Sequence, residues 1–158
     1  MKKMNMRNIT LCLVGSLLLL SVTSCQKSST PAAKSRTELI SSSGWKVTKE
    51  EYKVGTGPWL DDTGSYAACE LDNVYLIKSN GTYEQNEGAT KCSPADPQII
   101  ETGTWVFLVN ETQLKVTSTG SPSSDTFSID QLDNNTIILS SSEIIGAITY
   151  YYRTTFKH

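Results

Sequence analysis

The sequence has little of what metal binding and most hydrolytic catalysis require. It contains one histidine, the terminal residue His158. A serine nucleophile needs a base beside it, and that base is usually histidine. Zinc sites combine several cysteines and histidines at short spacings, and no Cys-x-x-Cys pair occurs here. We therefore expect no catalytic residues, no metal site and no cofactor, and hence no enzyme.

Positive charge is scarce and scattered. No cluster of lysine and arginine with interleaved aromatic residues occurs, although such clusters are typical of nucleic-acid binding. The formal net charge is −2, which also argues against an anionic lipid surface as a partner. The carboxylates Glu84, Glu87 and Glu101 show no pattern that pairs them for acid–base chemistry, so we expect them to face solvent.

No apolar run is long enough to cross a membrane as a helix. The longest run, residues 9–20, follows a positively charged segment, as in a secretory signal peptide. It leads into Val-Thr-Ser-Cys, which ends at Cys25 and looks like a lipobox, the site where a bacterial lipoprotein is cleaved and acylated. The alternative is cleavage by the ordinary signal peptidase, with Cys25 in this place by coincidence.

These motifs divide the chain into a signal peptide (1–24), a flexible tether (25–43) and a folded domain (44–158). Fatty-acyl groups such as palmitate on Cys25 would hold the mature protein on a membrane without crossing it. Loss of three positive charges with the signal takes the net charge from −2 to −5. The tether is rich in Ser, Thr, Lys and Ala, with one helical turn expected at 37–42. No acidic cluster follows Cys25, which favours the periplasmic face of the outer membrane over the cell surface.

Cysteine usage agrees with export. After removal of the signal and acylation of Cys25, two cysteines remain, Cys69 and Cys92. An even pair in an oxidising compartment predicts a disulfide. A zinc site is the competing interpretation, but the chain lacks the additional ligands that it needs.

The folded domain is predicted to be all-β. Alternating apolar and polar residues recur at intervals of about ten, separated by turn residues, including a type I′ hairpin signal at Asn80-Gly81. The expected strands span residues 45–53, 73–78, 82–86, 103–109, 113–117, 126–132, 136–140 and 147–156, with a longer connection at 141–146. Eight antiparallel strands joined in order predict a closed up-and-down barrel, and a Greek-key sandwich is the alternative.

Strand alternation assigns one face of each strand to the barrel interior. The expected inward residues are Trp45, Val47, Tyr75, Ile77, Tyr83, Trp105, Phe107, Leu114, Val116, Phe127, Ile129, Ile137, Leu139, Ile148, Tyr150, Tyr152 and Phe156. Of these, Tyr83, Trp105, Tyr150 and Tyr152 are candidate ligand contacts, because their polar atoms can orient a mostly apolar guest. The alternative is a packed aromatic core with hydroxyls near the rim.

The longest loop between strands, residues 54–68, is a candidate lid. Long ordered loops are often functional, and Trp59, Leu60 and Tyr66 would be its apolar contacts. The alternative is a compact surface loop that packs Trp59 permanently on the outside of the barrel.

The central stretch 69–105 carries a resemblance to a known family. Its Cys-Glu-x-Asp start (69–72), Asn-Gly-Thr-Tyr hairpin (80–83), Gly-x-x-x-Cys loop (88–92) and Gly-x-Trp strand (103–105) resemble, in that order, the lipocalin-like domain family of Gram-negative bacterial lipoproteins. The resemblance implies a lipocalin-like (calycin) barrel over nearly all of residues 40–157. It also implies that Trp45 closes one end of the barrel, with Arg153 as the basic residue that covers it.

Two functions follow as hypotheses. The first is a membrane-anchored binding protein, expected to be monomeric, that holds a small apolar or amphipathic molecule in the barrel. The second is a non-enzymatic protein- or glycan-interaction module with a filled barrel. An interior cavity of a few hundred Å³ would favour the first, and a filled interior would favour the second.

Overall fold

The computed structural model describes residues 32–158, so the predicted signal peptide and Cys25 lie outside the described residues. Residues Ala33–His158 form one compact unit. Its elements are α1 (Arg36–Ile40), β1 (Gly44–Val54), β2 (Leu60–Asp61), η1 (Thr63–Ser65), α2 (Ala68–Leu71), β3 (Val74–Ile77), β4 (Thr82–Asn86), β5 (Ile99–Leu108), β6 (Gln113–Ser118), β7 (Asp125–Leu132), β8 (Thr136–Ile145) and β9 (Ile148–Lys157). None of the helices in the described part of the chain is long and apolar enough to cross a membrane.

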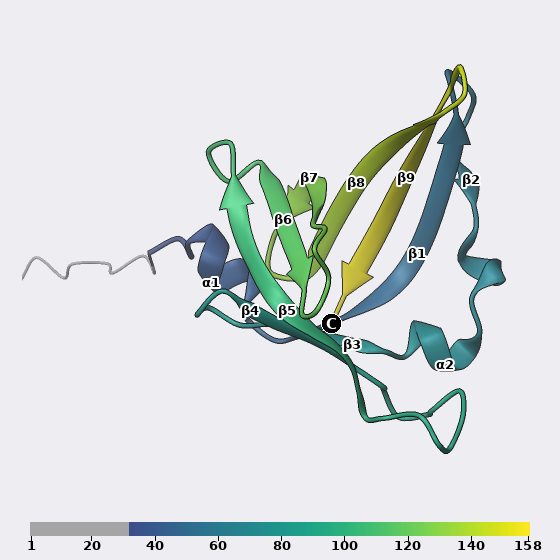
Figure 1. Ribbon diagram of the computed structural model, residues 1–158. Coiled ribbons are helices and arrows are strands. Elements are labelled where there is room, and N and C mark those ends of the chain that lie inside the picture. The colour runs from purple at the N-terminus through teal and green to yellow at the C-terminus, as the bar shows by residue number, and fades with distance from the viewer. Residues whose placement is uncertain (1–31) are drawn as a thin grey trace, which may run out of the picture. The chain divides into compact units, whose positions relative to one another are not determined.

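The strands form a closed antiparallel barrel (Figure 1). Strands β3 to β9 follow one another in chain order, and β1 closes the ring by pairing with β3 on one edge and β9 on the other. The two-residue strand β2 is added outside the ring, beside β1. The predicted eight-stranded up-and-down barrel is therefore confirmed, because β1 pairs with both β3 and β9 and closes the sheet on itself.

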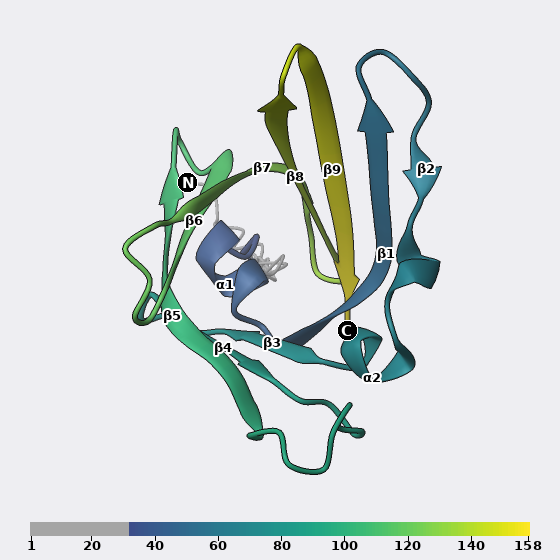
Figure 2. The same cartoon turned by 45° about the vertical axis from the view of Figure 1, so that its right-hand side comes forward.

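The barrel has one closed and one open end. The tight hairpins β3–β4, β5–β6 and β7–β8 meet at the closed end, where α1 lies inside the ring of strands in Figure 2. The loops β4–β5 and β6–β7 and the hairpin β8–β9 lie at the open end. The β8–β9 hairpin and the end of β1 extend beyond the other strands there (Figure 1).

Helix α1 and Trp45 plug the closed end. Ser35 and Glu38 form a reciprocal capping box that starts the helix. Ile40, at its end, is fully buried, as is Trp45, whose Nε1 donates to the Ile40 carbonyl at 2.7 Å. The expected helical turn is present, but residues 36–43 belong to the folded unit, so the predicted tether boundary at residue 43 lies too late in the chain.

His158, rather than Arg153, covers Trp45. The two rings lie 3.8 Å apart, and the imidazole nitrogens lie 3.1 Å from the Gly44 carbonyl and 3.0 Å from the Asn134 carbonyl. Arg153 points outward and forms an ion pair with Glu51 at 2.7 Å. The pairing of β1 with β9 contains a bulge at Thr48 of β1, and β9 itself is regular.

Two turns differ from the sequence-based expectation. Residues 141–145 belong to β8, which continues to a tight hairpin at Gly146 (φ 65°) in place of a long connection. The β3–β4 hairpin is not type I′, because Gly81 has a positive φ (85°) and Asn80 does not. The Gly81 amide instead donates to the Lys78 carbonyl at 3.0 Å, which gives a three-residue loop ending in a left-handed glycine.

A disulfide joins the connection between β1 and β3 to the β4–β5 loop. Cys69 lies on α2 and Cys92 lies in the β4–β5 loop, with their Cα atoms 5.3 Å apart. The predicted pairing of these cysteines is therefore confirmed. The bond holds α2 and the β4–β5 loop together beside the point where β1 and β3 separate.

Candidate ligand-binding cavity

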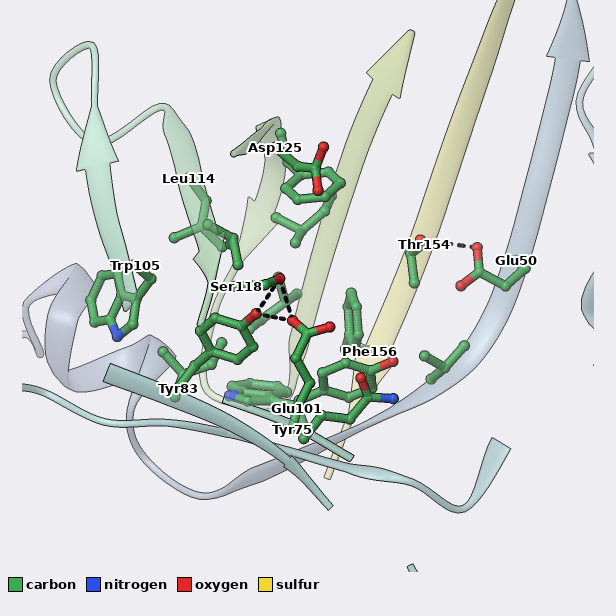
Figure 3. Close-up of a pocket in the computed structure, with 18 residues that line it drawn as sticks. Glu50, Tyr75, Tyr83, Glu101, Trp105, Leu114, Ser118, Asp125, Thr154 and Phe156 are labelled. Atoms are coloured by element: carbon green, nitrogen blue, oxygen red, sulfur yellow. Dashed lines mark hydrogen bonds between the residues drawn. The ribbon is translucent and has the colours of Figure 1, made fainter. Parts of the chain in front are cut away.

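The barrel encloses a cavity of about 290 Å³, and all eight strands of the ring contribute to its lining (Figure 3). This volume stands at the small end of ligand pockets, which run from roughly 300 to 1,000 Å³. The lining consists of Trp45, Val47, Glu50, Tyr75, Ile77, Tyr83, Gln85, Glu101, Trp105, Leu114, Val116, Ser118, Asp125, Phe127, Ile137, Leu139, Thr154 and Phe156.

The closed half of the cavity is apolar. Trp45, Leu114 and Ile137 are almost completely buried and form its floor. Trp105 also lines the cavity, but its Nε1 donates to the Lys78 carbonyl at 2.9 Å, so its polar atom is satisfied by backbone. A guest that enters this half therefore meets carbon surface, which favours an apolar group.

The open half of the cavity is polar and acidic. Strand register places the polar side chains of the lining toward the ends of β4 and β6, the starts of β5 and β7, and the middle of β1 and β9. These side chains are Glu50, Gln85, Glu101, Ser118, Asp125 and Thr154. The cavity is therefore amphipathic along its own axis.

Glu101 is held in the cavity by two hydroxyl groups, as Figure 3 shows. Its Oε1 accepts hydrogen bonds from the Tyr83 hydroxyl and from Ser118 Oγ, the latter at 2.7 Å. No donor within residues 32–158 reaches its second oxygen, Oε2. Burial and the bond to Glu101 raise the pKa of Tyr83, which keeps this phenol protonated as a donor. The carboxylate is thus oriented, with one oxygen left for a further donor.

Glu50 enters the cavity because of the bulge at Thr48. Without the bulge, strand alternation from Trp45 and Val47 would turn Glu50 to the outside. Its Oε2 accepts a hydrogen bond from Thr154 Oγ1 at 2.9 Å (Figure 3). Burial raises the pKa of Glu50, and nearby Asp62 adds to this effect. Burial together with Glu50 and Glu101 also raises the pKa of Tyr75 to about 12.

A second hollow of about 400 Å³ adjoins the first on the side of the barrel. It exists because β1 pairs with β3 over only two residues and then diverges from it. Both hollows share Val47, Glu50, Tyr75 and Gln85. The rest of the side hollow is lined by Tyr66, Glu70, Leu71, Asn73, Glu87, Cys92 and Ile100.

The candidate ligand residues are divided between the cavity and the surface. Tyr83 and Trp105 line the cavity. Tyr150 and Tyr152 lie on the β8–β9 hairpin where it extends beyond the other strands, and the Tyr152 hydroxyl donates to Glu143 at 2.5 Å. Ile148 on the same hairpin is exposed. By alternation from Thr154 and Phe156 these three residues lie on the inward face of β9, but they lie beyond the residues that line the cavity.

The loop 54–68 does not lie across the open end. Through β2 it runs back along the outer edge of β1. Trp59 stacks on the outward-facing Arg153, whose guanidinium carbon lies 4.2 Å from the ring centroid, and Leu60 is exposed. The structure thus matches the alternative of a surface loop that packs Trp59 on the outside. Tyr66 lies at the side hollow.

Sequence reasoning missed the acidic half of the site. Glu101 shares a strand face with Trp105, but the expected strand began at residue 103 and excluded it. It lines the cavity instead of facing solvent, and Glu87 is buried with 8% of its surface exposed. Ser118 and Asp125 follow the alternation of their strands. Strands predicted one residue longer, to 118 and from 125, would have placed both side chains in the interior. Strand alternation does not predict that Glu50 faces the interior, because the bulge at Thr48 reverses the direction of its side chain.

A comparison with known protein families and with curated proteins found no match to this chain.

Proposed function

We propose that this chain is a membrane-anchored, lipocalin-like binding protein that holds a small amphipathic molecule in its barrel. The observation that carries the proposal is the cavity of about 290 Å³ with an apolar closed half and a polar open half. An enclosed apolar site with a few convergent polar groups is the usual form of a small-molecule site. The role is binding, with no chemical step.

The interior supports the first of the two hypotheses drawn from the sequence over the second. An interaction module with a filled barrel needs large side chains throughout the ring. Here aromatic residues do not fill the interior of the barrel, because Trp45 and Trp105 lie toward its closed end and Tyr150 and Tyr152 lie beyond the cavity. The open cavity therefore favours ligand binding over a purely external role.

Anchoring is the second part of the proposal. Acylation of Cys25 would place the barrel at the periplasmic face of the outer membrane, connected by residues 25–32, which end where the folded unit begins at Ala33. Cys25→Ala should move the protein from the membrane fraction to the soluble fraction. Membrane retention of this variant at high salt would contradict lipid anchoring.

Native mass spectrometry of the protein purified from its own host tests the binding role. We expect added mass that disappears on denaturation, because a ligand held in a small apolar cavity is retained during gentle purification. A matched sample of Leu139→Trp, which fills the cavity with a larger side chain, should lack the added mass. Equal mass in both samples would show that any bound molecule lies elsewhere.

A further inference from the structure

The charged side chains that line the two adjoining hollows are all of one sign. Their carboxylates are Glu50, Glu70, Glu87, Glu101 and Asp125. Among the residues that the structure describes, no lysine, arginine or histidine contributes to either lining. A cavity without a ligand does not need an excess of carboxylates in its lining. A binding site for a positively charged guest does, because its charges must be complementary to those of the guest.

The carboxylates of the two linings are also not neutralised by the protein. The ion pairs found within residues 32–158 use Glu51 and Glu84, which belong to neither lining. Burial raises the pKa of Glu50, as expected for a buried carboxylate without a cation beside it.

Two polar side chains in the side hollow are buried without partners. Glu87 and Asn73 are only 8% and 7% exposed, and both line this hollow. In the described part of the chain, no donor reaches Glu87 Oε2 or Asn73 Oδ1. A buried acceptor without a donor is costly, and a ligand that carries N–H groups would remove that cost. This observation is independent of the charge bias and points to the same kind of ligand.

We propose that the guest is an amphipathic cation. Its apolar part occupies the closed half of the cavity between Trp45 and Leu114, and its protonated nitrogen lies in the open half at Glu50, the carboxylate that both hollows share. Glu101 Oε2 provides a second acceptor for the same group. This inference rests on the proposed binding function and adds the chemical class of the ligand.

The site suits an organic cation better than a metal ion. No three acidic, histidine or cysteine side chains within residues 32–158 lie close enough together to hold a metal. The carboxylates are instead spread along the open half, above an apolar floor. A charged nitrogen with a hydrocarbon chain satisfies both surfaces at once, and charge-assisted hydrogen bonds to carboxylates supply its specificity.

Isothermal titration calorimetry with three ligands of equal length tests the inference. Octylamine is cationic at neutral pH, octanoate is anionic and octanol is neutral. We expect octylamine to bind at least about tenfold more tightly than octanoate, with octanol between them, and added salt should reduce the difference. Equal affinities would overturn the cation inference and leave the binding function standing, whereas no binding of any of the three would overturn the binding function itself.

Charge-removing variants locate the effect. Glu50→Gln and Glu101→Gln keep the side-chain shape, and each should narrow the preference for octylamine over octanoate by about threefold or more. Glu111→Gln is the matched control, because it removes the same charge from the exposed β5–β6 turn at the closed end. A thermal melt shows that each variant is folded. If Glu111→Gln narrows the preference as much as the cavity variants do, the effect is one of net charge and the inference is wrong.

Discussion

Removal of the Cys69–Cys92 disulfide is expected to cost a large share of the stability of this domain. The bond closes a loop with a sequence separation of 23 residues. The restriction of the unfolded chain by such a loop is worth about 3.4 kcal/mol at 25 °C. Cys92 is exposed and Cys69 only half-buried, so replacement of both leaves little cavity in the core. The loss in the free energy of unfolding should therefore be mostly this chain-restriction contribution.

Urea unfolding of Cys69→Ser/Cys92→Ser, both in a Cys25→Ser background, measures this loss. With a slope of about 1.5 kcal/mol per M, the midpoint should fall by about 2 M. The disulfide-containing chain under reducing conditions is the matched control and should show the same shift. A loss below about 1 kcal/mol, or two reactive thiols in the unreduced denatured protein, would refute the reasoning.

Three further changes test other parts of the structure. Gly103→Ala should cost about 1–3 kcal/mol in urea unfolding, because its Cβ would overlap the Tyr83 ring and the Thr117 carbonyl; unchanged stability would mean that this close approach is absent. Trp59→Ala should cost about 1–2 kcal/mol, less than the 3–5 kcal/mol of a core tryptophan, and leave octylamine binding unchanged; a loss of binding would restore the loop as a lid. Burial raises the pKa of Glu50, so the folded protein binds this proton more tightly than the unfolded chain and loses stability as pH rises past the ordinary value of 4.5. Glu50→Gln should therefore be more stable than the unaltered protein at neutral pH but not below about pH 4, and a variant that is less stable at neutral pH would show that the charged form is favoured by the fold.

The sequence was sufficient for the barrel and its disulfide because both follow from local patterns. Period-two alternation identifies strands, short turns between them imply antiparallel neighbours, and eight such strands close on themselves. The floor of the cavity follows by the same rule, since Trp45, Leu114 and Ile137 all lie at alternating apolar positions. The pairing of Cys69 with Cys92 needed only the count of cysteines in the predicted folded domain.

The acidic half of the site was not predictable in the same way, because it depends on departures from regular pairing. The bulge at Thr48 turns Glu50 inward, and a threonine at position 48 does not by itself predict a bulge. The side hollow arises because β1 leaves β3 after two paired residues, which is a property of how the whole ring closes. The covering of Trp45 by His158 likewise depends on where the last strand ends, and alternation within that strand says nothing about it.

The buried polar atoms that lack a partner differ in kind between the two ends of the barrel, and this difference bears on function. At the closed end, the indole nitrogens of Trp45 and Trp105 both donate to backbone carbonyls, and the buried atom without a partner is a donor, Arg36 Nε on α1. At the open end, the buried atoms without a partner are acceptors, because Asn73 Oδ1 and Glu87 Oε2 have no donor among residues 32–158. Buried acceptors without donors destabilise the fold, and proteins retain such unfavourable features mainly at functional sites. The open end therefore presents buried acceptors to a donor, which is the arrangement expected if a guest with N–H groups binds there.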